Sequence, residues 1–254
     1  MWDMASKSIG TPYPDAMPDS EETVETGDGR TRRWDEHKQE RRLRILEAAV
    51  ALFSERGREA GVKDIAERAR LPRSVVYRIF KDRDDLDEQV REFIVADLMS
   101  ALTPTLVPHG TIRDAIRDSV ESYVGWLEKN QTLHLFLGAG STSRPTAGSH
   151  VVVSARTSIG SDVANYLYQF LSAKGADPRF AQPLAFALIG TVDATVNRWL
   201  SQSQPRISPT ELAEFLQISL WSLIEAHCRI LGIDIDPDMT IDNLDLVGDP
   251  PTAH

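Results

Sequence analysis

The chain has 254 residues, 41% apolar and 26% charged, which is typical of a globular protein with a sizeable core. Its apolar runs are far shorter than the ~20 residues of a membrane helix, and residues 1–30 are too polar and acidic for a secretory signal. The single cysteine, Cys228, excludes an internal disulfide framework and a cysteine-built zinc site. We therefore expect a cytoplasmic protein without a metal or other cofactor.

The net charge of −10 is distributed in three blocks. Residues 31–83 carry fifteen Lys or Arg against nine Asp or Glu, whereas residues 1–30 have a net charge of −5 and residues 84–254 one of −11. A basic block between two acidic ones favours a module that binds a polyanion, attached to an acidic body.

Both ends of the chain are predicted to be tails. Residues 1–33 contain three prolines and few large apolar side chains, which indicates a disordered acidic tail with a basic end. The arginines of that end, Arg30 to Arg33, fit a solvated linker or a basic arm that contacts DNA. Residues 232–254 interleave aspartates with isolated apolar residues and are predicted to form an acidic C-terminal tail.

Between the tails the apolar residues recur at spacings of three and four, which predicts an all-α fold of about nine helices. Pro104 and Pro108 are expected to break the pattern, and Thr111 with Asp114 resembles a capping box. Residues 138–149 are small and polar and predict a loop. The predicted helices cover about 37–56, 62–70, 73–81, 84–101, 112–127, 151–174, 178–200 and 209–231.

The basic block contains a helix-turn-helix pattern. Two short helical segments with a tight connection at residues 70–73 follow a longer support helix. The second segment, residues 73–81, would enter the major groove of DNA and present polar groups to phosphates or guanine. An amphipathic helix with solvated charges remains the alternative. The polar face of this segment holds Arg73, Ser74, Tyr77, Arg78 and Lys81.

The residues of this block resemble a known family. VKDIAERARLPRSVVYRIFKDRDDL (62–86) is similar to the DNA-binding domain of the tetracycline-repressor (TetR) family, and RILEAAVALFSERGRE (44–59) to its first helix. GTVDATVNRWL (190–200) is loosely similar to a late helix of many members. The resemblance implies a three-helix DNA-binding domain over residues 34–83 and a helical effector-binding and dimerisation domain over residues 84–231.

The resemblance also implies DNA contacts. Tyr77 matches the family's phosphate-contacting tyrosine, Arg83 a phosphate-gripping lysine, and Lys63 a position that often reaches DNA. Arg73, Ser74 and Arg78 match positions that vary with the operator, and their arginines favour G·C-containing half-sites. The predicted DNA-binding residues are Lys63, Arg73, Ser74, Tyr77, Arg78, Lys81 and Arg83.

Some positions depart from the family pattern and put individual contacts in doubt. Gly61 replaces a threonine cap, Arg70 a turn glycine, Pro72 a serine cap, and Ile79 a histidine or aromatic residue. These replacements are compatible with the fold, because glycine caps a helix tolerably and proline is accepted at a helix start.

For the body, the resemblance implies an apolar effector cavity and a four-helix bundle formed by the last two helices with those of a second subunit. Core packing is the alternative role of the aromatic residues. The candidate effector pocket is Tyr123, Trp126, His134, Phe136, Tyr166 and Phe170, and the candidate dimer interface is Leu188, Val192, Trp199, Phe215, Leu216 and Leu223.

These features predict a sequence-specific transcriptional regulator, namely a ligand-responsive homodimeric repressor that a small apolar effector releases from a near-palindromic operator. The alternatives are a ligand-independent regulator or activator, and a small-molecule-binding protein with a decayed DNA module. An enzyme is not expected, because the six histidines are scattered and no phosphate-binding glycine motif is present. The operator, the regulated genes, the effector and the sign of regulation are not specified by these residues.

Overall fold

The computed structural model describes residues 26–241 except 108, 139–148 and 203–206, and every regular element in these ranges is helical. The all-α prediction is confirmed, with eight α-helices in the described ranges and two short 3-10 turns at Gly57–Glu59 and Pro178–Phe180. No described helix is both long and apolar enough to span a membrane. The helices are α1 (Thr26–Arg56), α2 (Val62–Arg68), α3 (Arg73–Ile79), α4 (Arg83–Leu106), α5 (Ile112–Gly138), α6 (His150–Ala173), α7 (Ala181–Ser201) and α8 (Pro209–Ile230).

The first helix begins earlier than the sequence predicts. It starts at Thr26, so residues 26–33 are helical, and the prediction of a tail through residue 33 is wrong at its end. Residues 1–25 lie outside the described ranges. The described residues up to Arg41 form one unit, and those from Arg42 onward form the other.

In the second unit, α2 and α3 pack on the latter half of α1 around a small apolar core of Ile45, Phe53, Ile65, Val76 and Phe80. This core continues into the body of the same unit, because the Phe53 ring lies 4.6 Å from that of Phe136 in α5. The predicted helix-turn-helix is therefore joined to the body by side-chain packing as well as by the chain.

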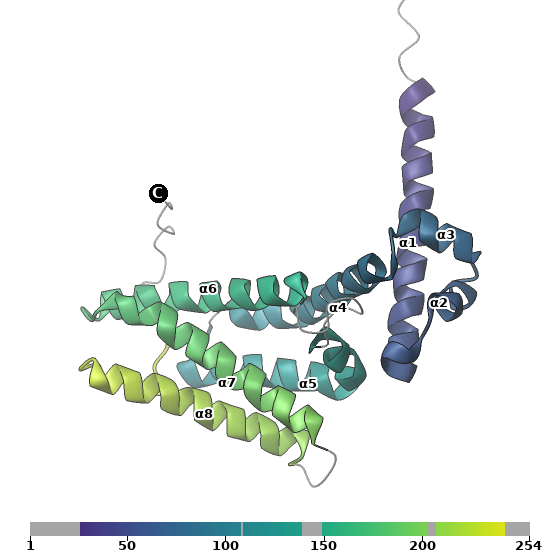
Figure 1. Ribbon diagram of the computed structural model, residues 1–254. Coiled ribbons are helices and arrows are strands. Elements are labelled where there is room, and N and C mark those ends of the chain that lie inside the picture. Colours follow the sequence, from purple (N-terminus) through teal and green to yellow (C-terminus); the bar gives the residue numbers. More distant parts are fainter. Residues whose placement is uncertain (1–25, 108, 139–148, 203–206, 242–254) are drawn as a thin grey trace, which may run out of the picture. The chain divides into compact units, whose positions relative to one another are not determined.

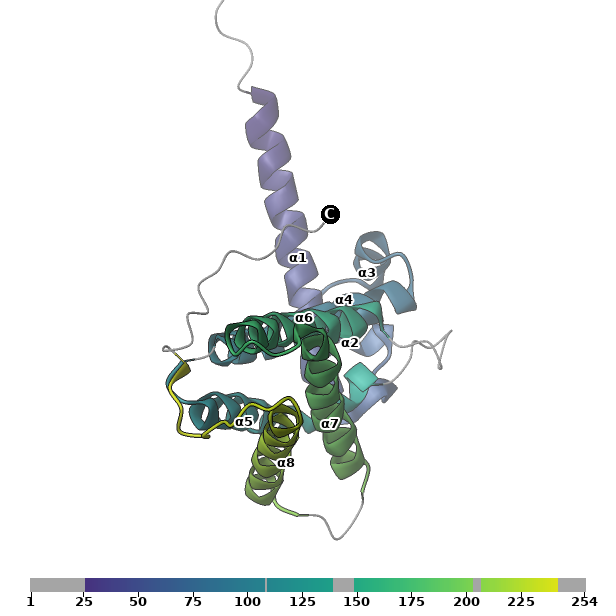
Figure 2. The same cartoon turned by 90° about the vertical axis from the view of Figure 1, so that its left-hand side faces the viewer.

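The body consists of α4 to α8. Helix α5 packs against α4 and α8, and α6 packs against α4 and α7. Figures 1 and 2 show α5 to α8 arranged around a common interior. Helix α4 continues through Pro104 to Leu106, contrary to the predicted break. Since Pro104 lies in the last turn, its missing N–H removes only one hydrogen bond near the helix end.

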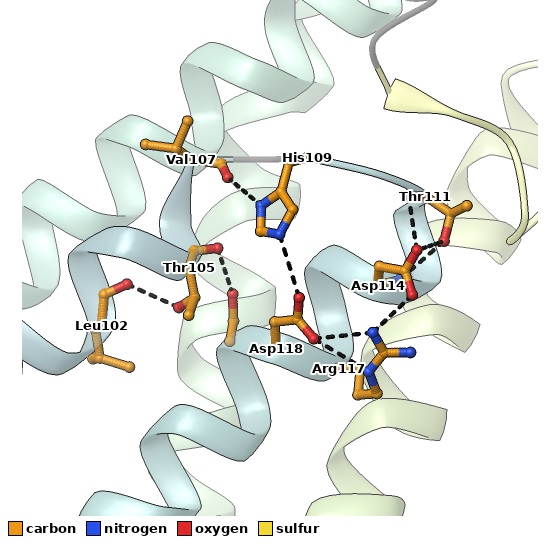
Figure 3. Close-up of polar contacts among 9 residues, drawn as sticks. Leu102, Thr105, Val107, His109, Thr111, Asp114, Arg117 and Asp118 are labelled. Atoms are coloured by element: carbon orange, nitrogen blue, oxygen red, sulfur yellow. Dashed lines mark hydrogen bonds and ion pairs between the residues drawn. The ribbon is translucent and has the colours of Figure 1, made fainter.

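The connection between α4 and α5 holds the predicted capping box (Figure 3). The amide of Asp114 donates to Thr111 Oγ1 over 3.1 Å, and the Thr111 amide donates to Asp114 Oδ2 over 3.1 Å. The hydroxyl of Ser119 donates to the Thr105 carbonyl over 3.0 Å and ties the first turns of α5 to the end of α4. His109 completes the connection, with Nδ1 against the Val107 carbonyl and Nε2 3.5 Å from Asp118.

Residues 232–241, here called the C-terminal strap, are not the free tail that the sequence predicts. Ile233, Ile235 and Ile241 are buried in a second apolar cluster with Phe170 and Cys228. The carbonyls of Met239 and Pro237 accept hydrogen bonds from the amides of Ile112 and Arg113, which begin α5. The sequence suggested a tail because the isoleucines of the strap are spaced too irregularly for a helix and alternate with aspartates. In the structure these aspartates face outward.

Candidate nucleic-acid interface and ligand cavity

The helix-turn-helix is built around a tight turn at residue 70. The Leu71 amide donates to the Ala66 carbonyl, and Arg70 has a φ of 54°, in the left-handed region where a family member usually has glycine. Pro72 then starts α3 with an extended backbone. The departures at Arg70 and Pro72 therefore leave the turn in place.

Helix α3 turns one face inward and leaves the other exposed. Val76 is fully buried, whereas the predicted contact residues Arg73, Ser74 and Arg78 are exposed and Tyr77 is 47% exposed. Arg73 Nη2 donates to the Tyr77 hydroxyl over 2.9 Å, and its guanidinium lies 5.3 Å from the centre of that ring. One cation and one hydroxyl are thus held together on the outer face of α3, where both can donate to phosphate or base acceptors.

The other predicted DNA contacts divide into two groups. Lys63 and Lys81 are exposed, and Lys63 makes only a surface ion pair with Glu67, at 3.8 Å. Arg83 instead turns inward, because its guanidinium donates to Asp87 Oδ1 over 2.8 Å and to the Ala60 carbonyl over 2.9 Å. We therefore correct the expectation for Arg83, which in this structure anchors the start of α4 to the end of the α1–α2 connection.

A cavity of about 330 Å³ lies among α4 to α8, and its wall is largely apolar. Of the six predicted pocket residues, Tyr123, His134 and Tyr166 line it and the other three do not. Trp126 is buried against α4 with its indole N–H on Asp97, Phe136 packs on Phe53, and Phe170 belongs to the cluster under the C-terminal strap. Helical spacing cannot separate these roles, since core and cavity walls are equally apolar.

The charged corner of the cavity, here called the polar quartet, is formed by Tyr123, His134, Arg156 and Asp193. The Tyr123 hydroxyl lies 2.9 Å from His134 Nε2, and Arg156 Nη2 lies 2.6 Å from Asp193 Oδ1. Desolvation by burial lowers the pKa of His134 to about 4 and raises the pKa of the Tyr123 hydroxyl well above its usual range, so both side chains are neutral near pH 7.

Sequence reasoning missed Arg156 and Asp193, because single charges on amphipathic helices usually belong to the solvated face. A signal was nevertheless present for Asp193. It is the only acidic residue in the otherwise apolar or small stretch from Gly190 to Val196.

A carboxylate links the cavity wall to α4. Glu88 Oε1 accepts hydrogen bonds from the Ser149 hydroxyl over 2.9 Å and from the Val151 amide over 3.3 Å, both at the start of α6. Glu88 Oε2 lies 3.1 Å from Nη1 of Arg91, which is 1% exposed and lies over the Phe136 ring. No sequence motif predicted this link, because its partners are more than fifty residues apart.

The predicted dimer interface needs correction. Leu188, Trp199 and Leu216 are buried within the subunit's own core and are not available to a partner. Val192 and Leu223 are half-buried, and only Phe215 is well exposed, at 53%. The outer face of α8 instead joins Phe215 to the 67% exposed Ile218. Along α7 the exposed positions include Ala187, Gly190 and Ala194.

Comparisons with known proteins agree with this geometry. Residues 45–90 match the family model described as bacterial regulatory proteins, tetR family. An uncharacterized HTH-type transcriptional regulator of Mycobacterium tuberculosis is 28% identical over 207 residues, covering 80% of this chain and 84% of the relative. The HTH-type transcriptional activator FasR of Mycolicibacterium smegmatis is 25% identical over 169 residues, covering 65% of this chain and 75% of the relative.

A solved structure shares the fold. The transcriptional regulator FadR of Bacillus subtilis, crystallised in complex with stearoyl-CoA, aligns with a TM-score of 0.53 at 18% identity, covering 70% of this chain and 96% of FadR. TetR-type regulators are not enzymes, as the sequence predicted. In the part of the chain that the structure describes, no group of three or more His, Cys, Asp or Glu side chains is placed to hold a metal ion. Residues 45–90 thus match the family model of tetR regulatory proteins, and a relative that aligns along most of the chain is named an HTH-type transcriptional regulator, so this chain is a DNA-binding transcriptional regulator of the TetR type.

Proposed function

We propose that this regulator is a ligand-responsive homodimeric repressor, acting in the cytoplasm and released from a near-palindromic operator by a small apolar effector. The observation that carries the proposal is the link through Glu88. This residue joins α6, which lines the cavity, to α4, which begins directly after the helix-turn-helix.

In this proposal the outer face of α3 reads the operator. Arg73 and Arg78 pair with guanine or phosphate, while Tyr77, Ser74, Lys63 and Lys81 hold the DNA backbone. Arg83 supports the domain from inside and is omitted from the contacts.

The exposed faces of α7 and α8 support the proposed dimer. Phe215 and Ile218 are large apolar side chains left open to water, and the small exposed residues of α7 permit close helix packing. Two-fold symmetry then presents two copies of α3 about one helical turn of DNA apart, which matches an operator with inverted half-sites.

The effector acts by linkage. A ligand that packs between α5, α6 and α7 favours one position of α6, and the Glu88 link passes that preference to α4 and the helix-turn-helix. A coupling of roughly 1–3 kcal/mol changes operator affinity about 5–150-fold. The apolar wall supports an apolar effector, and FadR, which shares the fold, was crystallised with a ligand that carries a long acyl chain.

An operator selected from randomised duplex DNA tests this proposal. We expect the purified chain to bind the selected duplex as a dimer and an apolar ligand of the cavity to weaken that binding at least fivefold. Unchanged operator affinity at a ligand concentration that saturates the cavity would contradict ligand-dependent release.

Activation is the second candidate, because the relative FasR is named an activator. A reporter gene behind the selected operator, measured with and without the regulator, separates the two signs. Lower expression with the regulator supports repression, and higher expression supports activation.

A further inference from the structure

The polar quartet is the one place where charged side chains reach the wall of the described cavity. Arg156 and Asp193 come from α6 and α7, and Tyr123 and His134 from α5. Most of the remaining lining residues are aliphatic. A ligand that fills the cavity therefore meets largely apolar surface, with the hydroxyls of Thr105, Ser119 and Tyr166 elsewhere on the wall and charged groups only at this corner.

This corner is electrically balanced. Arg156 and Asp193 are in direct contact at 2.6 Å, and Asp193 Oδ1 also accepts a 3.0 Å hydrogen bond from Asn197 Nδ2. His134 and Tyr123 add no charge near pH 7, because burial lowers the pKa of the imidazole to about 4 and raises that of the phenol. The cation and the anion of the quartet thus cancel, and its two neutral members offer hydrogen bonds.

We propose that the polar quartet binds the uncharged oxygen of the effector, a hydroxyl or a carbonyl, while the apolar body of the same molecule fills the rest of the cavity. This inference rests on the proposed effector function of the cavity and narrows the ligand to neutral amphipathic molecules.

A charged head group fits this corner poorly. A carboxylate that accepts from Arg156 would also lie beside the Asp193 carboxylate, so repulsion between the two anions would offset its attraction to the guanidinium. An ammonium group that pairs with Asp193 would likewise lie beside the positive charge of Arg156 and be repelled by it. A hydroxyl or carbonyl can instead accept a hydrogen bond from the guanidinium while the ion pair stays intact.

The test uses three probes of equal chain length and different charge, namely decan-1-ol, decanoate and decylammonium. At roughly 30 Å³ for each water-sized group, 330 Å³ holds about eleven such groups, so a ten-carbon chain is of suitable size. Binding to the full chain is measured by isothermal titration calorimetry at pH 7.5, without DNA. We expect decan-1-ol to bind at least tenfold more tightly than either ion.

Two variants that change charge at nearly constant shape sharpen the test. Asp193→Asn leaves the charge of Arg156 uncompensated, so decanoate should bind at least tenfold more tightly than to the unmodified chain. Arg156→Gln leaves the negative charge of Asp193 uncompensated, so decylammonium should bind more tightly by a similar factor. Glu225→Gln is the matched control, because it removes an ion pair with Arg229 on α8 outside the cavity wall and should change none of the three affinities.

The outcomes separate the two proposals. The neutral head group would be contradicted if decanoate or decylammonium bound the unmodified chain as tightly as decan-1-ol does. It would also be contradicted if neither charge variant gained affinity for its matching ion. Either result would leave the proposed effector cavity unaffected. Binding of none of the probes would overturn the effector cavity and this inference with it.

Discussion

The hydroxyl of Ser149, at the start of α6, donates a 2.9 Å hydrogen bond to Oε1 of Glu88 in α4. The other oxygen of the same carboxylate lies 3.1 Å from the guanidinium of Arg91, which is buried. Glu88 therefore binds the first turn of α6, a helix that lines the cavity, and also the buried Arg91 of α4, the helix that follows the DNA-binding domain. In the proposed function, Glu88 is a residue through which changes in α6 are passed to α4.

Replacing Glu88 with Gln should lower the free energy of unfolding by about 2 kcal/mol, because hydrogen bonds to charged groups contribute about 1.5–3 kcal/mol each. The amide keeps one acceptor for Ser149 but weakens the ion pair with Arg91. Urea unfolding measures the change. Glu92→Gln, at an exposed position of the same helix, is the control and should alter stability by less than about 0.5 kcal/mol.

Arg83 and Tyr77 should respond differently to mutation. Arg83→Ala removes one partner of the buried Asp87 and a bond to the Ala60 carbonyl, so we expect a stability loss of about 2 kcal/mol. Tyr77→Phe removes only an exposed hydroxyl and should leave the melting temperature within about 1 °C while weakening operator binding. Thermal unfolding and DNA titration of both variants check this contrast. An Arg83→Ala protein of unchanged stability would show that the inward contacts contribute little.

The turn between α2 and α3 contains a correctable strain. Arg70 has a φ of 54°, where a residue with a Cβ is disfavoured by roughly 1–2 kcal/mol. Arg70→Gly should therefore stabilise the protein by about 0.5–1 kcal/mol after the entropy of glycine in the unfolded chain is subtracted. Arg68→Gly, in the last turn of α2, is the opposite control and should destabilise it.

The buried His134 predicts a loss of stability in acid. Desolvation lowers its pKa in the folded protein to about 4, from 6.5 in an unfolded chain. Between these values the unfolded state binds a proton that the folded state does not, so stability falls as the pH drops from about 6.5 to 4. The full effect is about 3 kcal/mol.

Urea unfolding at pH 7 and pH 4.5 measures this effect in the unmodified chain and in His134→Gln. The variant cannot titrate at this position and should lose about 2–3 kcal/mol less over that interval. His109→Gln, at an exposed histidine, is the control and should follow the unmodified chain. Equal acid sensitivity of all three proteins would contradict a buried neutral imidazole.

The C-terminal strap should be required for stability. A chain ending at Leu231 loses three buried isoleucines, worth about 1.5–3 kcal/mol each, and the carbonyls that accept from the first amides of α5. We expect it to be destabilised by about 5 kcal/mol or more. A chain ending at Ile241 keeps the entire strap and should unfold at the same urea concentration as the full chain.

The sequence predicted those features that depend on local pattern. Apolar spacing identified the helices, and the residues of the second and third helices were sufficient to recognise the helix-turn-helix and its exposed face at Arg73 and Tyr77. The capping box at Thr111 and Asp114 was predicted from the same kind of local signal. Local geometry determines these features, so no knowledge of the packing was needed.

Features that depend on contacts between distant segments were predicted poorly. Leu188 and Phe136 lie on apolar stripes like those of any bundle, and only the packing shows that they face the subunit core. The strap was mistaken for a tail because the amides that it pairs with belong to α5, more than a hundred residues away. Arg83 matched a DNA-contacting position; Asp87 lies at the i,i+4 spacing of a helical ion pair, but the Ala60 carbonyl, 23 residues away in the sequence, could not be identified from spacing.

The most direct test of the DNA-binding role is a selection from randomised duplex DNA with the purified full chain, repeated with a variant that carries both Arg73→Ala and Tyr77→Ala. We expect an enriched sequence with two inverted half-sites about one helical turn apart, and we expect this enrichment to disappear in the variant. No enriched sequence, or the same sequence enriched by the variant, would contradict operator recognition by the exposed face of α3.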